Sequence, residues 1–367
     1  MKIKYITNIL KSQKSGGMSG INNAIFNHFK NYSSYFQYQY INPPLVIQEK
    51  ILSKLFKLLR IPRNYFFFSE TRLDIIQKEF SEDQECDFYF FHGFTPWIKI
   101  KPGKPYYCYN DACFGTYLEY YNNKKIFKKS DIQRIFDREK YWLENAKAVF
   151  FQSDWALNET KKLYQTKGDH FFKVGVGGFI DIPKRDSFSG KKEFLFIARE
   201  FVPKGGTEAV EAIQLVRSKY PEVSLSIIGE KPNIEILKLP NVKYIGFLDK
   251  NNSIHLSKLT EVFSNTFALI HPTVKDINPL VINELAYFGC PAISSNKFAI
   301  PEYIMDKKTG FLLIEPRNTN EIASKMITLL ENNNIYNNMR IRTRQFSIEN
   351  NTWEVVFGKM IKVILEK

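Results

Sequence analysis

The sequence has few cysteines and no long hydrophobic run, and each absence excludes a class of protein. It contains 4 cysteines in 367 residues, and none of them forms a C-x-x-C pair. A zinc site or a disulfide framework is therefore not indicated, and a reducing, cytoplasmic setting is expected. No apolar stretch approaches the roughly 20 residues that a membrane-spanning helix needs. The opening stretch, MKIKYITNIL, is too short and too polar for a secretory signal, and it predicts a buried strand instead.

Acidic residues are in the minority. The formal net charge is +14, and most of the excess lies in the first half of the chain. Residues 1–180 contain 27 Lys and Arg against 17 Asp and Glu, whereas residues 181–367 contain 25 against 21. Such an excess indicates nucleic acid, an anionic membrane surface or an acidic substrate as the partner. A general bias of the sequence toward Lys and Asn explains the charge equally well.

What the sequence does contain is a regular alternation of short apolar runs and helical patterns. Its apolar fraction of 44% and charged fraction of 25% are typical of a globular chain, and its length allows two domains. The alternation breaks at residues 181–192, where Pro, Lys, Ser and Gly indicate a linker. Strands that alternate with helices predict parallel sheets covered on both faces, one on each side of the linker. The predicted strands are residues 4–7, 88–91, 106–109, 148–152, 172–176, 194–198, 225–228, 242–245, 267–270 and 292–294, and the clearest helices are 206–219 and 320–331.

The predicted strand 267–270 is followed by a polar loop and a short helix. Ligands of open α/β sheets bind beyond the carboxyl ends of the strands, so this loop is a candidate binding segment. It carries Asp276, and the helix is predicted over residues 279–288, with Asn278 as its N-cap and Gly289 as the left-handed residue after its end. The free amides at such a helix start attract an anion. Since Asp276 and Glu284 lie on either side of that start, the segment suits a ligand with a phosphate and sugar hydroxyls. One capped helix with an incidental glutamate is the alternative interpretation.

A second polar loop follows the predicted strand 194–198. It carries Arg199 and Lys204, and two glycines precede the next helix. Two cations beside a permissive turn suit a diphosphate, because Arg binds it in a bidentate manner and Lys acts as a point charge. A solvated loop with no ligand is the alternative.

Together the two segments resemble the retaining glycosyltransferases of family 4, which have the GT-B architecture. That family has two glutamates separated by seven residues, and here Asp276 and Glu284 have this spacing. It also has an Arg and a Lys five apart after the first strand of its C-terminal domain, matched by Arg199 and Lys204. The resemblance covers residues 194–331 in order and spacing, and the first half of the chain only in outline. The flanking matches are His271-Pro272, Gly289-Cys290-Pro291, Pro301-Glu302, Thr309-Gly310 and, at the last helix, Thr352-Trp353-Glu354.

The resemblance implies an α/β fold with two Rossmann-like, doubly wound parallel-sheet domains facing a central cleft. The acceptor-binding domain would cover residues 1–180 and the nucleotide-sugar-binding domain residues 181–350, and a helix at 351–367 would cross back to the first domain. The implied donor-binding residues are Gly16, Gly17, Arg199, Lys204, Gly246, Phe247, Leu248, Asp276, Asn278, Pro279, Leu280, Val281 and Glu284. The implied catalytic residues are Arg199, Lys204, Asp276 and Asp111.

Within this resemblance, Arg199 and Lys204 neutralise the donor diphosphate, Asp276 contacts the donor sugar and Glu284 binds the ribose hydroxyls. The amides near residues 278–281 bind the distal phosphate, and residues 246–248 contact the base. Two positions depart from the family. Asp276 is one methylene shorter than the family's glutamate, which leaves the donor sugar open, and Ala198 stands where the family commonly has glycine.

The first half of the chain offers weaker candidates. A loop with Gly16 and Gly17 follows the first strand and opens a helix, and glycines there let the backbone approach a phosphate closely. Asp111 follows the strand 106–109 and resembles an acidic residue that faces the acceptor in relatives. His92 follows the strand 88–91 and either lines the cleft or has a structural role.

Residues 51–63, ILSKLFKLLRIPR, combine apolar residues at helical spacing with Lys54, Lys57, Arg60 and Arg63, and aromatic residues follow them. This composition suits a helix that lies on an anionic lipid surface through residues 51–68. An ordinary amphipathic helix of the core is the alternative. Nucleic acid is not expected as a partner, because no recognised nucleic-acid module is visible.

The sequence therefore predicts a retaining, metal-independent glycosyltransferase that uses a UDP-sugar or GDP-sugar and needs no cofactor. Its acceptor would be a hydroxyl of a lipid-linked or polysaccharide glycan, of the O-antigen or capsule type. The expected location is the cytoplasm or the inner face of the plasma membrane. No Asp-x-Asp metal motif appears where one would be useful, and no histidines have metal-ligand spacing. The alternatives are a non-catalytic sugar-nucleotide-binding protein and a phosphorylase or epimerase of the same fold.

Overall fold

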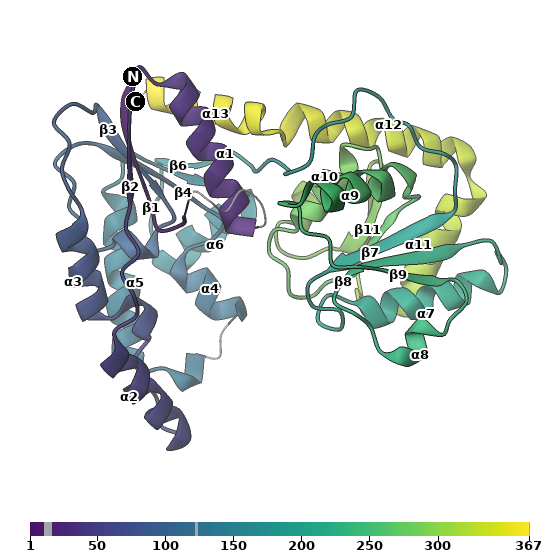
Figure 1. Ribbon diagram of the computed structural model, residues 1–367, viewed down its shortest axis with the longest axis horizontal. Coiled ribbons are helices and arrows are strands. Elements are labelled where there is room, and N and C mark those ends of the chain that lie inside the picture. The colour runs from purple at the N-terminus through teal and green to yellow at the C-terminus, as the bar shows by residue number, and fades with distance from the viewer. Residues whose placement is uncertain (11–16, 122–123, 367) are drawn as a thin grey trace. The chain divides into compact units, whose positions relative to one another are not determined.

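The computed structural model describes residues 1–10, 17–121 and 124–366, and the chain divides into two compact units (Figure 1). Unit 1 consists of Met1–Gly175 together with Phe357–Lys367, and unit 2 of Val176–Val356. Each unit contains one 6-stranded sheet whose neighbouring strands all pair in parallel. The prediction of an α/β fold built on two parallel sheets is confirmed.

The sheet of unit 1 has the strand order β2-β1-β3-β4-β5-β6. Its inner strands β3 and β5 are almost entirely apolar, and every residue of both is buried. Near-continuous apolar runs of this kind are characteristic of parallel strands covered on both faces. The elements are β1 (Lys2–Thr7), α1 (Gly17–Tyr32), β2 (Tyr35–Tyr40), α2 (Ile47–Leu58), α3 (Glu70–Glu79), β3 (Phe88–His92), β4 (Tyr106–Asn110), α4 (Phe114–Tyr121), α5 (Lys129–Glu144), β5 (Ala148–Phe151), α6 (Asp154–Tyr164) and β6 (Phe171–Lys173).

The sheet of unit 2 has the order β12-β11-β10-β7-β8-β9. Figure 1 shows α7 and α8 on one side of this sheet and α9 and α10 on the other. The elements are β7 (Glu193–Ala198), α7 (Gly206–Arg217), β8 (Ser224–Gly229), α8 (Ile234–Leu237), β9 (Val242–Gly246), α9 (Ser253–Asn265), β10 (Leu269–His271), α10 (Leu280–Ala286), β11 (Ala292–Ser295), β12 (Gly310–Leu313), α11 (Thr319–Glu331) and α12 (Asn333–Asn350). The last helix, α13 (Trp353–Glu366), begins in unit 2 and continues into unit 1.

All the predicted strands are present, and two further strands were missed. The first is β2, YFQYQY, which lies at the edge of its sheet and has no buried residue. The second is β12, GFLL, which is only four residues long. Predicted boundaries were also too wide at β6 and at α10, which ends at Ala286 rather than at residue 288. Both missed strands lie at sheet edges, but the edge strands β6 and β9 were predicted, so an edge position alone does not hide a strand from an apolar-run criterion.

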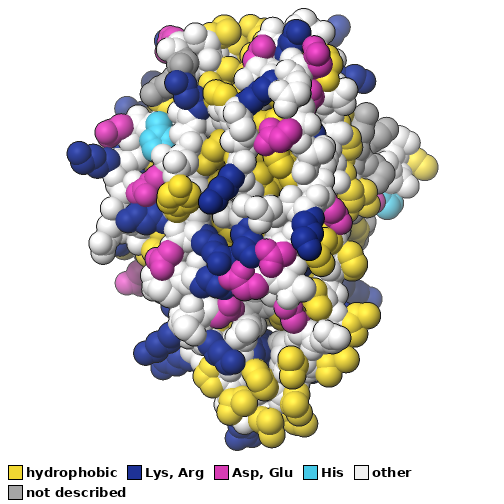
Figure 2. All heavy atoms as spheres, turned by 90° about the vertical axis from the view of Figure 1, so that its left-hand side faces the viewer, with side chains coloured by type: hydrophobic (Ala, Val, Ile, Leu, Met, Phe, Trp, Pro, Cys, Tyr) yellow, Lys and Arg dark blue, Asp and Glu magenta, His cyan; other side chains and the backbone are white. Residues whose placement is uncertain are grey.

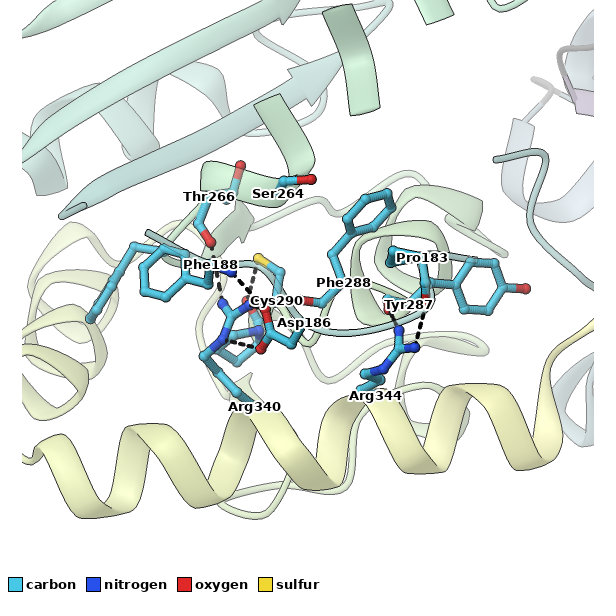
Figure 3. Close-up of polar contacts among 12 residues, drawn as sticks. Pro183, Asp186, Phe188, Ser264, Thr266, Tyr287, Phe288, Cys290, Arg340 and Arg344 are labelled. Atoms are coloured by element: carbon cyan, nitrogen blue, oxygen red, sulfur yellow. Dashed lines mark hydrogen bonds and ion pairs between the residues drawn. The ribbon is translucent and has the colours of Figure 1, made fainter. Parts of the chain in front are cut away.

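Residues 181–192, predicted as a linker between two domains, contain no helix or strand and lie within unit 2. Residues of α12 bind this segment (Figure 3). The guanidinium of Arg340 donates to both carboxylate oxygens of Asp186, over 2.8 and 2.6 Å, and to the carbonyl of Phe288 over 2.6 Å. It also stacks over the ring of Phe188 at 4.2 Å. Arg344, one turn further along α12, donates to the carbonyl oxygens of residues 183 and 287. Charge-assisted hydrogen bonds from α12 therefore fix residues 183–186 within unit 2.

None of the helices formed by the described residues is long and apolar enough to cross a membrane.

Candidate functional site

The two polar loops singled out in the sequence lie at one edge of the unit 2 sheet. β7 and β10 pair in parallel, so the loops that follow them leave from the same edge. Gly205, in the first loop, has φ +91, and a Cβ placed on it would lie 2.6 Å from Pro272 Cγ and 2.8 Å from Pro272 O. Only glycine tolerates both that conformation and that approach. The glycine therefore lets the loop bearing Lys204 pack directly on the loop bearing Asp276.

Lys204 and Asp276 form an ion pair across these loops. Lys204 Nζ lies 2.6 Å from Asp276 Oδ2, and the two side chains are 16% and 23% exposed. The same ammonium donates to the carbonyl of Lys275 over 3.0 Å. Burial by itself raises the pKa of Asp276, but His271 and Lys204 lower it more, so that the pKa lies below its usual range. Asp276 is therefore ionised at neutral pH, and it holds the ammonium at the edge of the sheet.

His271, the last residue of β10, is a site residue that sequence reasoning used only as a family match. Its Nε2 lies 3.5 Å from Asp276 Oδ2, and its side chain is 2% exposed. Neither ring nitrogen has a hydrogen-bond partner within the described ranges, so the contact with Asp276 is electrostatic at this distance. His271 is thus a buried group next to the carboxylate of Asp276.

Glu284 is a fully buried carboxylate on α10, with 2% of its side chain exposed. Its Oε1 accepts the backbone N–H of Phe179 over 2.9 Å and a short hydrogen bond from the ammonium of Lys250. A Cβ on Gly178 would lie 2.8 Å from Glu284 Cγ, so glycine is needed there for the chain to pass so close. Lys250 lies in the loop after β9 and was missed in the sequence, because nothing in its local pattern marks it as the partner of a distant glutamate.

The loop between β9 and α9 brings further candidates to this unit. Gly246 ends β9 with φ +107, Phe247 is 55% exposed and Leu248 is half-buried. The pKa of Asp249 is lowered, first by the backbone and side-chain hydrogen bonds from Asn251 and to a smaller degree by His255 and Arg199. Arg199 follows β7 and is exposed. It therefore lies within electrostatic range of this loop, as a ligand spanning both loops would require.

The predicted start of the short helix needs correction. α10 begins at Leu280, with Pro279 rather than Asn278 in the N-cap position and with no side-chain cap. The Asn278 side chain instead accepts a hydrogen bond from the hydroxyl of Tyr303. With residues Leu280–Ala286, α10 has fewer than two full turns, so its macrodipole is small. The lysines and the arginine are therefore the main source of positive charge at this edge. Gly289 adopts the expected left-handed conformation, with φ +73.

The candidates of unit 1 divide into those described and one outside the described residues. Gly16 lies outside them, and Gly17 is the first residue of α1 with φ +50. Asp111 is half-buried in the loop between β4 and α4. His92 is buried at the end of β3 with 1% exposure, and burial lowers its pKa to about 3. A neutral, enclosed imidazole of this kind favours the structural interpretation of His92.

Sequence reasoning also missed Glu139, which is fully buried on α5. Its carboxylate accepts from the hydroxyl of Thr95 over 2.6 Å, from the backbone N–H of Phe114 over 2.7 Å and from the hydroxyl of Tyr164. Burial raises its pKa, and these hydrogen bonds oppose the rise. Since Thr95 follows β3 and Phe114 opens α4 after β4, Glu139 connects the segment that follows His92 to the start of α4, just after the loop that carries Asp111.

A search of the described residues for three or more His, Cys, Asp or Glu side chains able to hold a metal ion together finds none.

These cations and carboxylates lie beyond the carboxyl ends of parallel strands, where open α/β units such as the nucleotide-binding ones hold their ligands. Residues 179–346 match the family model described as Glycosyl transferases group 1. This part of the chain belongs to that family, and the resemblance stated from the sequence is confirmed.

The curated relatives are distant. The chain is 22% identical over 258 residues to lipopolysaccharide glucosyltransferase WaaG of Escherichia coli, covering 62% of this chain and 66% of that protein. It is 27% identical over 162 residues to an uncharacterized 41.2 kDa protein in the cps region of Klebsiella pneumoniae, covering 43% of this chain and 41% of that one. The chain therefore matches less than two thirds of the length of these relatives.

Solved structures resemble the whole chain. A sucrose-phosphate synthase from Thermosynechococcus elongatus matches with a TM-score of 0.70 at 14% identity, over 100% of this chain and 99% of that one. Alr3699/HepE of Anabaena in complex with UDP matches with a TM-score of 0.67 at 13% identity, over 100% of both chains. WaaG matches with a TM-score of 0.64 at 13% identity, over 97% of this chain and 98% of that one. These similarities confirm the predicted GT-B fold.

Proposed function

We propose that the protein is a retaining, metal-independent glycosyltransferase that moves a sugar from a nucleoside-diphosphate sugar to a hydroxyl acceptor. The observation that carries this proposal is the pair of ion pairs, Lys204–Asp276 and Lys250–Glu284, at the carboxyl edge of the unit 2 sheet. They lie within the segment that belongs to the glycosyltransferase family. In both pairs the carboxylate suits hydroxyl groups, and in the first pair Lys204 is the cation proposed for the diphosphate.

In this proposal, Lys204 and Arg199 bind the donor diphosphate. Lys204 is already held at the edge of the sheet by Asp276 and the carbonyl of Lys275, so it needs little reorganisation when charge develops on the leaving group. Preorganised cations of this kind replace a metal ion in stabilising that charge. Asp276 contacts the donor sugar, and the backbone of Asn278, Pro279, Leu280 and Val281 lies next to the distal phosphate.

The donor is proposed to be a UDP-sugar or a GDP-sugar. Support for UDP comes from structural relatives: Alr3699/HepE was solved with UDP and with UDP-glucose, and TarM with UDP. In our proposal, the base lies on Gly246, Phe247 and Leu248, and the exposed ring of Phe247 is available for stacking. The ribose hydroxyls bind Glu284.

The acceptor is proposed to be a lipid-linked or polysaccharide glycan of the O-antigen or capsule type. Support comes from the names of two relatives, a lipopolysaccharide glucosyltransferase and a protein of a cps region. We assign acceptor binding to unit 1 and propose Asp111 as the catalytic residue that faces the acceptor, whereas Gly16 and Gly17 are proposed to bind the donor.

The exposed surface of α2 suits contact with a membrane, where a lipid-linked acceptor would lie. Of the residues of this helix, only Ser53 is buried, which argues against the interpretation of α2 as a core helix. Large apolar side chains cover it and its C-terminal flank: Ile47, Ile51, Leu52, Leu55, Leu58, Leu59 and Ile61. Figure 2 shows these hydrophobic side chains gathered at the lower end of the face, where Figure 1 places α2. Contiguous exposed apolar patches mark interaction surfaces.

The cations around this patch complete the proposed membrane contact. Lys54, Lys57 and Arg60 are exposed, and each contributes about 1 kcal/mol on an anionic surface. Arg63 is different, because it is half-buried and its guanidinium lies 5.7 Å from the ring of Phe127. We therefore propose that residues 51–68 dock on anionic lipid, with Lys54, Lys57 and Arg60 as the main cations of that surface and Arg63 turned partly toward Phe127.

The proposed function is tested by incubating the protein with UDP-sugars and GDP-sugars and a panel of glycan acceptors. We expect release of the nucleoside diphosphate and, with the right acceptor, a product with the anomeric configuration of the donor. Binding of a sugar nucleotide without hydrolysis or transfer would instead indicate a binding protein. An inverted product would contradict the retaining mechanism.

A further inference from the structure

The loop between β9 and α9 has one contact that the proposed donor site does not yet explain. Lys250 donates to Glu284 Oε1, which also accepts the N–H of Phe179. Lys250 itself is 19% exposed, and its ammonium lies 5.9 Å from the centre of the Phe179 ring. Phe179 in turn stacks on Trp353 at 5.9 Å. Three separate segments of unit 2 therefore meet at one buried oxygen.

We propose that Lys250 is a positioning residue for the donor, which holds the Glu284 carboxylate through their ion pair in the orientation that accepts the hydroxyls of the nucleotide ribose. The inference rests on the proposed function. A carboxylate with 2% exposure is costly to leave without a cation. Lys250 supplies that cation from one side of the carboxylate, and the amide of Phe179 fixes its direction.

The position of Lys250 in the chain gives the contact a role beyond stability. It follows the proposed base-binding residues Gly246, Phe247 and Leu248 in the same loop. A shift of that loop on base binding is therefore transmitted to the carboxylate that binds the ribose. Lys250 couples recognition of the two halves of the nucleoside through a contact that need not touch the ligand.

The other titratable groups around Glu284 do not replace Lys250. Tyr287, from the same helix, donates its hydroxyl to the carbonyl of Asn351 and accepts the N–H of Gly178. Burial raises the pKa of Tyr287, and Glu284 and Glu354 act in the same direction. Tyr287 therefore stays neutral, and among the described residues Lys250 is the cation in an ion pair with Glu284.

The test compares binding of UDP and 2′-deoxy-UDP, or the guanine equivalents, by isothermal titration. The variants are Lys250→Met, which keeps the length of the side chain without its charge, Lys250→Arg, Glu284→Gln and the double variant Lys250→Met/Glu284→Gln. Lys243→Ala is the matched control, because Lys243 is an exposed residue of the preceding strand β9. Retention of fold is checked by circular dichroism, and the double variant avoids an unpaired buried charge.

We expect the wild-type protein and Lys243→Ala to prefer the ribonucleotide. Lys250→Met should lose about tenfold in affinity for UDP, as for loss of one hydrogen bond to a charged group, and little affinity for the deoxynucleotide. Lys250→Arg should restore most of the affinity, and the double variant should bind no more weakly than Glu284→Gln alone.

Different failures have different meanings. If the wild-type protein binds no nucleoside diphosphate, the proposed function is wrong and the inference with it. If the wild-type protein prefers the ribonucleotide but Lys250→Met keeps the same affinity and preference, only the role of Lys250 is wrong. Tighter binding by Lys250→Met also overturns it, because Lys250 would then compete with the ribose for Glu284.

Discussion

Replacement of Lys204 by alanine isolates the contribution of one cation to the proposed transfer. Its ammonium lies 2.6 Å from Asp276 Oδ2 and 3.0 Å from the carbonyl of Lys275. Only 16% of its side chain is exposed, so solvent screens it weakly. Loss of one preorganised group that stabilises developing charge costs about 2–4 kcal/mol. We therefore expect Lys204→Ala to lower kcat/KM by roughly 30- to 1,000-fold.

The fold should survive this change. The Asp276 side chain is 23% exposed, and His271 Nε2 lies 3.5 Å from its Oδ2. Without Lys204 the carboxylate therefore keeps contact with solvent and with His271. Its pKa should return toward the ordinary value, because Lys204 is one of the two groups that lower it. Lys204→Arg keeps the charge and should recover part of the rate. Lys275→Ala is the matched control. Lys275 is exposed, and it contacts the ammonium of Lys204 through its backbone carbonyl, which the substitution keeps.

The assay is the initial rate of nucleoside diphosphate release with saturating acceptor, together with the melting temperature of each variant. Arg199→Ala should lose a comparable amount of activity, because Arg199 is the second proposed diphosphate cation. If Lys204→Ala transfers sugar within about threefold of the wild-type rate, a difference of less than 1 kcal/mol, the diphosphate does not bind at this edge and the site is misplaced.

Four further outcomes are expected. Activity should persist in excess EDTA, because protein cations take the place of a metal; abolition by EDTA with rescue by a divalent ion contradicts that mechanism. Wild-type protein should co-sediment with anionic vesicles better than with neutral ones, and less at high salt, whereas a Lys54/Lys57/Arg60→Glu variant should lose the preference; equal binding by both proteins removes the docking surface. Asp186→Asn should lower the free energy of unfolding of unit 2 by about 3 kcal/mol, because it leaves the buried guanidinium of Arg340 without its anion. The control, Asp181→Asn, changes an exposed residue of the same segment and should leave that free energy nearly unchanged; both are measured by urea unfolding. Stability should fall as the pH decreases from 6.5 to about 3, because His92 takes up a proton in the unfolded chain before it does so in the folded one; His92→Phe should flatten this slope in urea titrations at several pH values.

The sequence was informative where local chemistry decides the structure. Inner parallel strands such as β3 and β7 are continuous apolar runs because both of their faces are covered. The loops after β7 and β10 were found for the same reason: polar and glycine residues stand directly after an apolar run, and parallel strands place such loops at one edge. Arg199, Lys204, Asp276 and Glu284 could be singled out in this way, and the family match of residues 179–346 supports the segment that contains them.

Other features depend on which residues meet after folding. The spacing in α2 is compatible with a core helix or an exposed one, and the tertiary structure decides the matter by burying only Ser53. The edge strand β2 owes its place to pairing with β1 along its whole length rather than to its own apolar residues.

The sequence by itself therefore determined the class of fold and the residue types of the candidate site. The tertiary structure alone decided how those charges are paired. Lys204 forms an ion pair with Asp276, which is far from it in the sequence, and Lys250 forms one with Glu284. A buried charge is costly unless a group of opposite charge lies within about 4 Å of it, and the packing of distant segments decides which group that is. The distance between two side chains cannot be read from their spacing in the sequence. The ion pairs of the site are therefore known only from the structure, which places the two loops and the end of β9 at one edge of the sheet.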